Sequence, residues 1–229
     1  MVGRYMYAVL FSLALTMASG FETASAIESG RGGRSYQIYL LKGLADIFSS
    51  GMDALAAKLQ ARGVVAEVHN HAFHDSLTQT AIAKWRGGAR GPVIIIGHSL
   101  GADAAFLMAQ RLNDARVPVA LLVTFGPVDD GAVPANVSSA VNYFQSNSVW
   151  HGRAARAPGF RGSLANVDLA YAAGITHFTI DKAEWLHATT IGSVLYVIAA
   201  RAQSAAAAPA SPPADRPTPV ATGEPPNRQ

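Results

Sequence analysis

Residues 93–101, VIIIGHSLG, decide the fold of this chain. Four β-branched residues in succession, 93–96, predict a buried strand that is covered on both faces. The small and helix-favouring residues 100–112, LGADAAFLMAQRL, predict a helix directly after it. The pattern Gly-x-Ser-x-Gly stands between the two. It is typical of a nucleophile elbow, in which a serine lies on a sharp turn between a strand and a helix. We therefore expect Ser99 to be an exposed nucleophile in a strained backbone conformation.

The spacing of this motif has a physical reason. Gly97 and Gly101 lack side chains, so the strand and the helix can approach each other closely on either side of the serine. The amide N–H groups at the start of the helix point at any negative charge that forms near Ser99. The alternative interpretation is an ordinary strand-Gly-helix turn that happens to contain a serine.

The composition excludes several classes of protein. The chain has 229 residues, of which 50% are hydrophobic and 14% charged, which favours a single sizeable core. The net charge is only +3 and no dense Lys/Arg stripe occurs, so nucleic acid is not an expected partner. Because the chain contains no cysteine, a disulfide framework, a thiolate metal site, a cysteine nucleophile and a cysteine lipid anchor are excluded.

The two ends of the chain differ from its middle. Arg4, the short apolar run 5–17 and the Ala-Ser-Ala site at 24–26 predict a signal peptide over residues 1–26 and hence export to the periplasm or the medium. An uncleaved membrane anchor and a cut after Gly20 are the alternatives. Residues 27–34 are expected to be a flexible lead-in. The Ala/Pro-rich residues 204–229 have no periodic apolar face and are expected to be disordered, which leaves residues 35–203 as one domain.

Within this domain, predicted strands alternate with predicted helices. The expected strands are 36–41, 64–69, 92–96, 117–125 and 137–144, and the expected helices are 51–61, 75–85, 100–112 and 182–201. The last helix has Asp181 as its expected cap and Glu184 three residues on. This alternation predicts an α/β fold: a mostly parallel central sheet with helices on both faces. Sites in such sheets form at the carboxyl ends of the strands, which is where Ser99 stands.

A serine needs a base that accepts its proton, and histidine is the usual one. The chain has seven histidines. His177 follows the late loop Gly174-Ile175-Thr176 and precedes the final helix, so we expect it to be the base. His187 is the rival, but it lies inside that helix, where its side chain has less freedom to reach the sheet.

Three further histidines, His69, His71 and His74, follow an early strand. If they came close together they could bind a metal. No cluster of carboxylates accompanies them except Asp75, so we expect histidines at the rim of the site and no metal. His98, inside the elbow, is expected to point away from the serine.

The acid that orients the base is expected after the strand that follows the elbow helix. Asp129 is the first choice, Asp130 the second and Asp168 the third. If that strand neighbours the elbow strand, its end lies roughly 5 Å away across the sheet. The competing interpretation of this segment is a turn rich in Asp and Gly.

An oxyanion hole needs two convergent N–H donors. The backbone N–H of Leu100, directly after the nucleophile, is one candidate. The second is expected from the loop after the first strand, where Gly43 allows a sharp turn and Leu44 supplies the N–H. Gly43 as a simple strand-ending glycine is the alternative.

The elbow Gly97-His98-Ser99-Leu100-Gly101-Ala102 resembles that of class 3 lipases and related esterases and thioesterases of the α/β-hydrolase superfamily. The segment 124–127, TFGP, also resembles the strand end that follows the elbow helix in that group. The resemblance implies a serine hydrolase acting on esters or thioesters without a metal or organic cofactor. Two features depart from it: Ala102 stands where a second glycine is usual, and the expected acid comes one strand earlier than in many members.

These observations predict an exported serine hydrolase that cleaves a small-molecule ester or thioester through an acyl-enzyme on Ser99. His177 would be the base, Asp129 the acid, and the N–H groups of Leu100 and Leu44 the oxyanion hole. The chain has little room for a lid, although the long irregular stretch 145–165 could cover the site. A non-catalytic binding module of the cell envelope and an acyltransferase with the same triad are the alternatives.

Overall fold

The computed structural model describes residues 36–44 and 49–207, which include the whole predicted domain except residues 35 and 45–48. The predicted signal peptide, the lead-in at 27–34 and most of the C-terminal tail lie outside the described residues. The final helix continues to Ala207, past the predicted end of the domain at residue 203 and into the tail expected to be disordered.

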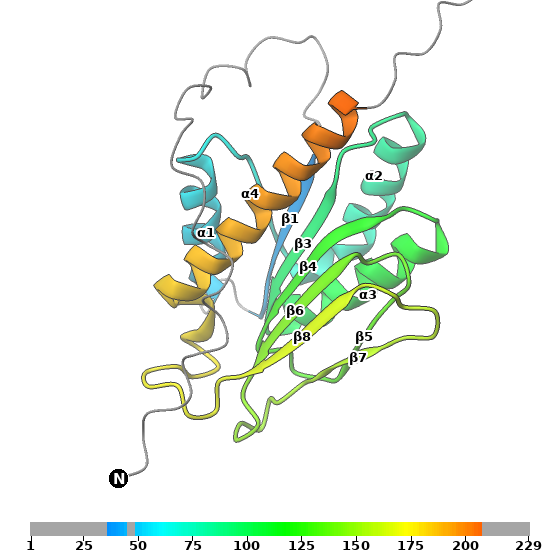
Figure 1. The fold of residues 1–229 in the computed structure, drawn as a ribbon. Helices are drawn as coiled ribbons and strands as arrows, with labels where there is room; N and C mark the ends of the chain where they lie inside the picture. Colours follow the sequence, from blue (N-terminus) through cyan, green and yellow to red (C-terminus); the bar gives the residue numbers. More distant parts are fainter. Residues whose placement is uncertain (1–35, 45–48, 208–229) are drawn as a thin grey trace, which may run out of the picture. The chain divides into compact units, whose positions relative to one another are not determined.

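A parallel sheet of six strands forms the centre of the fold, in the order β2-β1-β3-β4-β6-β8 (Figure 1). The strands are β1 (Gln37–Lys42), β2 (Glu67–Asn70), β3 (Val93–His98), β4 (Val119–Phe125), β6 (Ser139–Phe144) and β8 (Ser163–Asp168). Every residue of β3 is buried, as its run of β-branched side chains predicts. The predicted α/β class with a parallel sheet is therefore confirmed.

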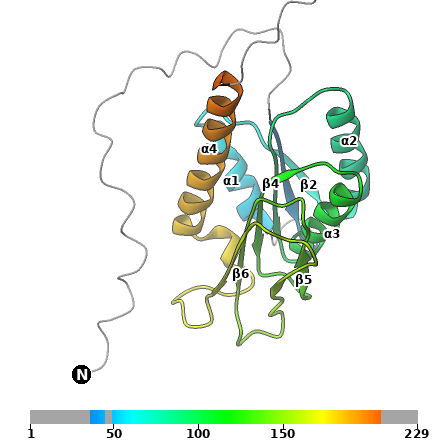
Figure 2. The same ribbon diagram turned by 45° about the vertical axis from the view of Figure 1, so that its right-hand side comes forward.

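Helices cover both faces of this sheet (Figures 1 and 2). The pair α1 (Ser50–Gln60) and α4 (Glu184–Ala207) lies on one face, and the pair α2 (His74–Arg86) and α3 (Leu100–Asp114) on the other. Among the described residues no helix is long and apolar enough to span a membrane.

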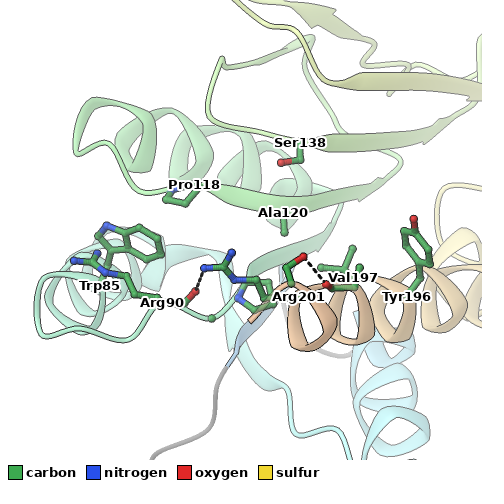
Figure 3. A pocket seen from close by; sticks show the side chains of 12 residues that line it. Trp85, Arg90, Pro118, Ala120, Ser138, Tyr196, Val197 and Arg201 are labelled. Atoms are coloured by element: carbon green, nitrogen blue, oxygen red, sulfur yellow. Dashed lines mark hydrogen bonds between the residues drawn. The ribbon is translucent and has the colours of Figure 1, made fainter. Parts of the chain in front are cut away.

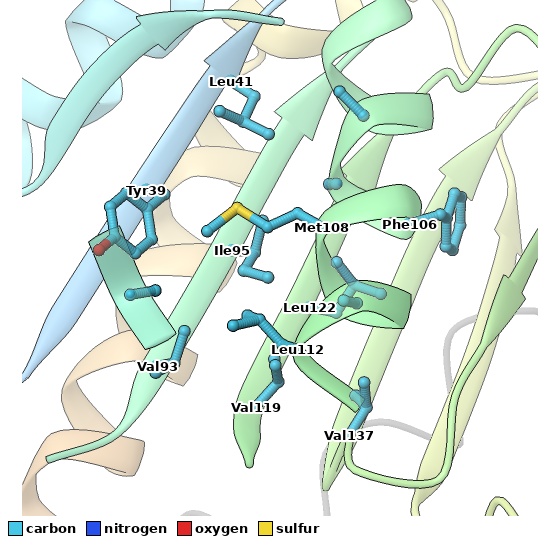
Figure 4. Packing of buried hydrophobic residues seen from close by; sticks show 14 of the residues in the cluster. Tyr39, Leu41, Val93, Ile95, Phe106, Met108, Leu112, Val119, Leu122 and Val137 are labelled. Carbon is cyan, nitrogen blue, oxygen red and sulfur yellow. The ribbon is translucent and has the colours of Figure 1, made fainter. Parts of the chain in front are cut away.

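Alternating side chains of the strands supply two separate cores. Tyr39 and Leu41 of β1 pack with Met108 and Leu112 of α3 on the face shown in Figure 4. Their neighbours Ile38 and Leu40 belong to a second cluster, in which the helical residues are Met52, Leu55, Leu59, Leu186, Ile191 and Val194. The two covered faces hold the central strands rigidly, so the loops at the carboxyl ends of β3, β4 and β6 project from a fixed base.

The C-terminal half contains strands that the sequence pattern does not reveal. A second sheet pairs β5 (Gly131–Val133) with β7 (Ala154–Arg156), and β8 begins at Ser163, so the expected irregular stretch 145–165 is partly ordered in strands. Short strands of three residues with mixed exposure carry too little alternation to be recognised.

The start of the last helix also differs from expectation. A short 3₁₀ helix, η3 (Ile180–Lys182), precedes α4, and Asp181 lies within it, fully buried. The carboxylate of Asp181 accepts the backbone N–H of Gly51 at 2.9 Å, so it holds the start of α1 and does not cap α4. A Cβ at Gly51 would overlap the backbone of Asp181, which explains why a glycine stands at this contact.

Candidate active site

Ser99 has the strained conformation that the elbow motif predicts. Its backbone angles are φ 57° and ψ −129°, a region that L-residues rarely adopt. The turn is held by its own hydrogen bonds: the N–H of Ser99 donates to the carbonyl of Phe125, and the carbonyl of Ser99 accepts the N–H of Ala102. The serine therefore stands rigidly between β3 and α3.

The glycines of the motif allow the close approach expected of them. A Cβ at Gly97 would lie 2.2 Å from the carbonyl oxygen of Gly101, and a Cβ at Gly101 would lie 2.1 Å from that of Leu41. Gly43 approaches the nucleophile from the β1 loop, because a Cβ there would lie 2.9 Å from the Cβ of Ser99. Larger residues at these positions would push the turn away from β1.

His177 reaches the serine from the loop between β8 and η3. Its Nε2 lies 2.9 Å from the Oγ of Ser99, across a separation of 78 residues. The ring is buried, and the indole of Trp150 lies against it with the ring centroids 4.5 Å apart. Burial is the main reason that the pKa of His177 is lowered to about 4, with a smaller contribution from His98. The imidazole is thus neutral at pH 7 and able to accept the proton of the serine.

The second nitrogen of this imidazole has no partner among the described residues. Nδ1 of His177 is buried and makes no hydrogen bond within the described part of the chain. Gly126 lies close to it, because a Cβ at this glycine would be 3.2 Å from Nδ1. Gly126 has a positive φ of 53°, so the chain turns sharply as β4 ends. No carboxylate among the described residues forms a hydrogen bond with Nδ1 of His177. The catalytic group that the described residues form is therefore a Ser–His pair.

The structure does not bring Asp129 to His177. After the turn at Gly126 the chain runs toward α3, and the N–H of Asp129 donates to the carboxylate of Asp103. The side chain of Asp129 is exposed. The other two candidates are also engaged elsewhere, since Asp130 accepts the N–H of Arg153 at 2.7 Å and Asp168 accepts that of Ser146 at 3.1 Å.

The carboxyl end of β6, one strand further along the sheet, carries an amide. Gln145 directly follows β6, and its side chain is buried. Its Nε2 donates to the carbonyl of Ile175 at 2.9 Å, in the loop that carries His177. Gln145 could not be predicted from the sequence, because a single glutamine after a strand has no distinctive pattern.

The two residues expected to supply the oxyanion hole come from the elbow and from the loop after β1. Leu100 is the first residue of α3, and Leu44 follows Gly43, which touches Ser99. Within the described part of the chain, neither backbone N–H makes a hydrogen bond. Both N–H groups therefore remain candidates for the oxyanion hole.

The remaining histidines take other roles. The Nε2 of His187 donates a hydrogen bond to the carbonyl of Asp181 at 2.6 Å. Its Nδ1 accepts a hydrogen bond from the ammonium group of Lys58. His69 faces Glu67, and His74 contacts the carbonyl of His71. No group of three metal-ligating side chains occurs among the described residues.

Two aromatic side chains lie beside His177, and we define them as the apolar rim: Trp150 and Phe178, whose ring centroids are 4.5 Å and 5.4 Å from that of His177. Both side chains are substantially exposed. Trp150 and Phe178 contact each other edge to face, with centroids 5.6 Å apart. Trp150 comes from the stretch after β6 that was expected to cover the site. Exposed apolar side chains beside the catalytic pair suit a substrate with an apolar group.

A separate pocket lies at the amino ends of the strands, away from Ser99 (Figure 3). Its walls come from the end of α2, from residues at the starts of β3, β4 and β6, and from α4, among them Trp85, Pro118, Ser138 and Tyr196. These residues are at the amino ends of the strands, whereas Ser99 follows the carboxyl end of β3. The pocket therefore has no part in the chemistry of the serine.

A helix-covered parallel sheet with a serine on a strained elbow after a central strand is an α/β-hydrolase fold. Comparison with protein-family models gives no match, and neither does comparison with curated protein sequences. Among solved structures, the chain is similar to human thioesterase 2 (12% identity, TM-score 0.43, 72% of this chain and 98% of that chain). It is also similar to a cutinase-like protein from Cryptococcus, with 12% identity and a TM-score of 0.43 over 71% of this chain and 94% of that chain. A third similar structure is the type II thioesterase BorB from the borrelidin biosynthetic cluster, with 12% identity and a TM-score of 0.39 over 71% of this chain and 94% of that chain.

Proposed function

We propose that this protein is an exported serine hydrolase that cleaves a small-molecule ester or thioester through an acyl-enzyme on Ser99. The observation that carries the proposal is the 2.9 Å contact between the Oγ of Ser99 and the Nε2 of His177. Acyl transfer needs a serine hydroxyl in contact with a neutral imidazole, and here the serine lies on a strained elbow and the imidazole is buried. The apolar rim favours an apolar acyl or alkyl group on the substrate.

In the acylation step, Nε2 of His177 accepts the proton as the Oγ of Ser99 attacks the carbonyl carbon. The negative charge that forms on the carbonyl oxygen is stabilised by the N–H groups of Leu100 and Leu44, aided by the amino end of α3. His177 then gives the proton to the leaving alcohol or thiol. Water attacks the acyl-enzyme with the same histidine as base, and the acid product leaves.

In the proposed cycle the pair Ser99–His177 acts without a hydrogen bond between Nδ1 of the histidine and any carboxylate of the described residues. A carboxylate would orient the ring and stabilise the imidazolium that forms in the transition state. Here the ring is oriented by packing, because Trp150 lies against one side and the backbone of Gly126 against Nδ1. Serine–histidine chemistry without that charge should be slower than a full triad.

A fluorophosphonate probe tests the nucleophile directly. We expect covalent labelling of Ser99, found by mass spectrometry of the labelled peptide, and hydrolysis of p-nitrophenyl esters by the same preparation. A panel of acyl chain lengths, run with Ser99→Ala and His177→Ala as inactive controls, then defines the acyl group. A folded protein that is neither labelled nor more active than Ser99→Ala would overturn the proposal.

Export has its own test. The apolar run 5–17 and the Ala-Ser-Ala site at 24–26 support cleavage of a signal peptide. Expression of the full chain in a bacterial host, followed by mass spectrometry of the mature amino terminus, should find a start at Ile27. An uncleaved chain in the cytosolic fraction would contradict it.

A further inference from the structure

A buried chain of hydrogen bonds joins three segments next to the catalytic pair: the loop after β1, the elbow, and the loop that carries His177. The N–H of Gly43 donates to the Oγ of Ser49 at 2.9 Å. The hydroxyl of Ser49 is in turn 2.9 Å from Nδ1 of His98. The Nε2 of His98 lies 2.9 Å from the carbonyl oxygen of His177. The chain thus ends on the backbone of the residue that contacts Ser99.

The chemistry of these atoms fixes where each proton is. A carbonyl oxygen only accepts, so Nε2 of His98 must carry the proton that it donates to His177. A neutral His98 then has a lone pair on Nδ1, which accepts the hydroxyl proton of Ser49, and the oxygen of Ser49 remains free to accept the N–H of Gly43. Ser49 and His98 thus each donate once and accept once, between the donor N–H of Gly43 and the acceptor carbonyl of His177. Burial lowers the pKa of His98 to about 4, in keeping with a neutral ring at pH 7.

The position of His98 allows it to fix Ser99 and His177 relative to each other. His98 is 1% exposed and Ser49 is also 1% exposed, so water does not replace their bonds. His98 directly precedes Ser99 in the chain, and its ring holds the backbone of His177. The nucleophile and the base are therefore fixed to each other through one side chain that touches neither reacting atom.

The amide side chain of Gln145 holds the same loop at a second point. Gln145 donates to the carbonyl of Ile175, two residues before His177. The loop of the base is thus held at two backbone carbonyls, each by a neutral and buried donor. These contacts occur in a site where Nδ1 of the base has no hydrogen-bond partner among the described residues.

We propose that His98 is a positioning residue: its donation to the backbone of His177 holds the imidazole on the Oγ of Ser99, a task that a carboxylate on Nδ1 usually performs. Gln145 assists from Ile175. The inference rests on the proposed function, because it assigns a role in the acylation of Ser99.

Two substitutions of His98 separate its two hydrogen bonds. The amide of His98→Gln reaches the place of Nε2, so it can still donate to His177 but cannot accept from Ser49. The shorter amide of His98→Asn reaches the place of Nδ1, so it keeps the contact with Ser49 and loses the donor to His177. Both variants lose one buried hydrogen bond, and a purely structural role would affect them alike.

His187→Asn is the matched control. His187 is also buried and also donates from Nε2 to a backbone carbonyl, that of Asp181. The control therefore loses the same kind of bond outside the catalytic pair. Thermal melts of all three variants identify any that fail to fold, and the fluorophosphonate reaction rate is measured on the folded ones.

We expect His98→Asn to acylate about 30-fold more slowly than the wild type with little change in KM for an ester substrate, because the base is misplaced while substrate contacts remain. His98→Gln should recover most of that rate, and His187→Asn should melt earlier yet acylate at the wild-type rate. Equal rates for the Asn and Gln variants of His98, at equal stability, would overturn the proposal.

A spectroscopic readout is independent of activity. Side-chain ¹⁵N shifts of the wild type at pH 7 should report His98 as the neutral Nε2–H tautomer. A proton on Nδ1 alone would leave no donor toward His177 and would overturn the proposal. If the wild type proves inactive toward the probe, the proposed function fails, and the tautomer measurement still decides whether the hydrogen bond to His177 exists.

Discussion

Gly126 occupies the side of His177 where an orienting carboxylate would be expected: a Cβ at this glycine would lie 3.2 Å from Nδ1 of the imidazole. The backbone at the end of β4 therefore packs directly against the base. The Nδ1 nitrogen is buried and makes no hydrogen bond among the described residues. The orientation of His177 depends on packing and on its own backbone contacts.

The contact with Gly126 predicts that even a methyl group there will disturb the base. Gly126→Ala adds a Cβ within 3.2 Å of Nδ1 at a φ of 53°. We expect a fall of about tenfold or more in the rate of acylation, because the ring must shift away from Ser99. The measurement is the rate of fluorophosphonate labelling.

Gly63→Ala is the matched control for this prediction. Gly63 also has a positive φ, of 76°, but nothing lies within 4 Å of a Cβ placed there. It should lose about 1 kcal/mol of stability for the strained backbone and keep full activity. If the two variants lost stability alike and both kept wild-type labelling rates, packing at Gly126 would not orient the base.

Asp129 gives the next prediction. Its side chain is exposed and its N–H donates to Asp103, so removal of its charge should not affect the base. We expect Asp129→Asn to hydrolyse p-nitrophenyl acetate within about threefold of the wild type, whereas His177→Ala should lose about a thousandfold or more. A loss of a hundredfold in the aspartate variant would instead support the acid role predicted from the sequence.

The difference between Ser99 and Asp129 shows what a sequence can reveal about a site. The elbow is a local feature: its strand, its two glycines and its helix are contiguous, so sterics alone predict the strained conformation of the serine. His177 could be proposed because a late loop before the last helix must return to the same edge of the sheet. The parallel, helix-covered class of the sheet follows from the same alternation of elements, whereas the order of the strands and the sixth strand, β8, could not be predicted from it.

The orientation of the base could not be predicted in this way. It depends on the path of the chain after Gly126, on a buried glutamine after β6, and on Ser49 and His98, which no spacing rule connects. His98 was expected only to point away from Ser99. The short strands β5 and β7 were missed because three residues of mixed burial have no periodicity.

The pH dependence of hydrolysis should reflect the buried base. His177 must be neutral to accept a proton, and burial lowers its pKa to about 4 from the ordinary value of 6.5. The rate, as kcat/KM, should therefore be retained as the pH falls from 7 to 5 and decline only near pH 4. Product release is measured chromatographically at each pH with Ser99→Ala as background, and circular dichroism checks folding. A half-maximal rate near pH 6.5 would be inconsistent with a buried base.

The strain at Ser99 predicts a difference between two inactive variants. Glycine adopts φ 57° and ψ −129° without steric cost, whereas alanine keeps the Cβ that makes this conformation unfavourable. We expect Ser99→Gly to be more stable than Ser99→Ala by about 1 kcal/mol, after the larger entropy of glycine in the unfolded chain is included. Urea unfolding at pH 7 measures the difference. An alanine variant as stable as the glycine variant would argue against a strained elbow.

Asp181 allows a final prediction about stability and pH. Its side chain is fully buried, its Oδ2 accepts the N–H of Gly51, and its Oδ1 has no partner among the described residues. Burial raises its pKa from 3.8 to about 6. The folded state thus binds this proton more tightly than the unfolded state does. The relative stabilisation is complete below pH 3.8 and is lost as the pH rises through 6, where the buried carboxylate becomes charged.

Asp181→Asn removes that charge and keeps an oxygen for the N–H of Gly51. We expect the variant to be more stable than the wild type at pH 8, by at most about 3 kcal/mol, and to lose this advantage as the pH is lowered from 6 to 4. His98 and His177 titrate over part of the same range, so the difference in free energy of unfolding between variant and wild type is the quantity to compare. Urea titrations at pH 4, 6 and 8 measure it. A variant that is less stable than the wild type at pH 8 would mean that the ionised carboxylate stabilises the fold through its neighbours, His98 at 3.7 Å and the adjacent Lys182.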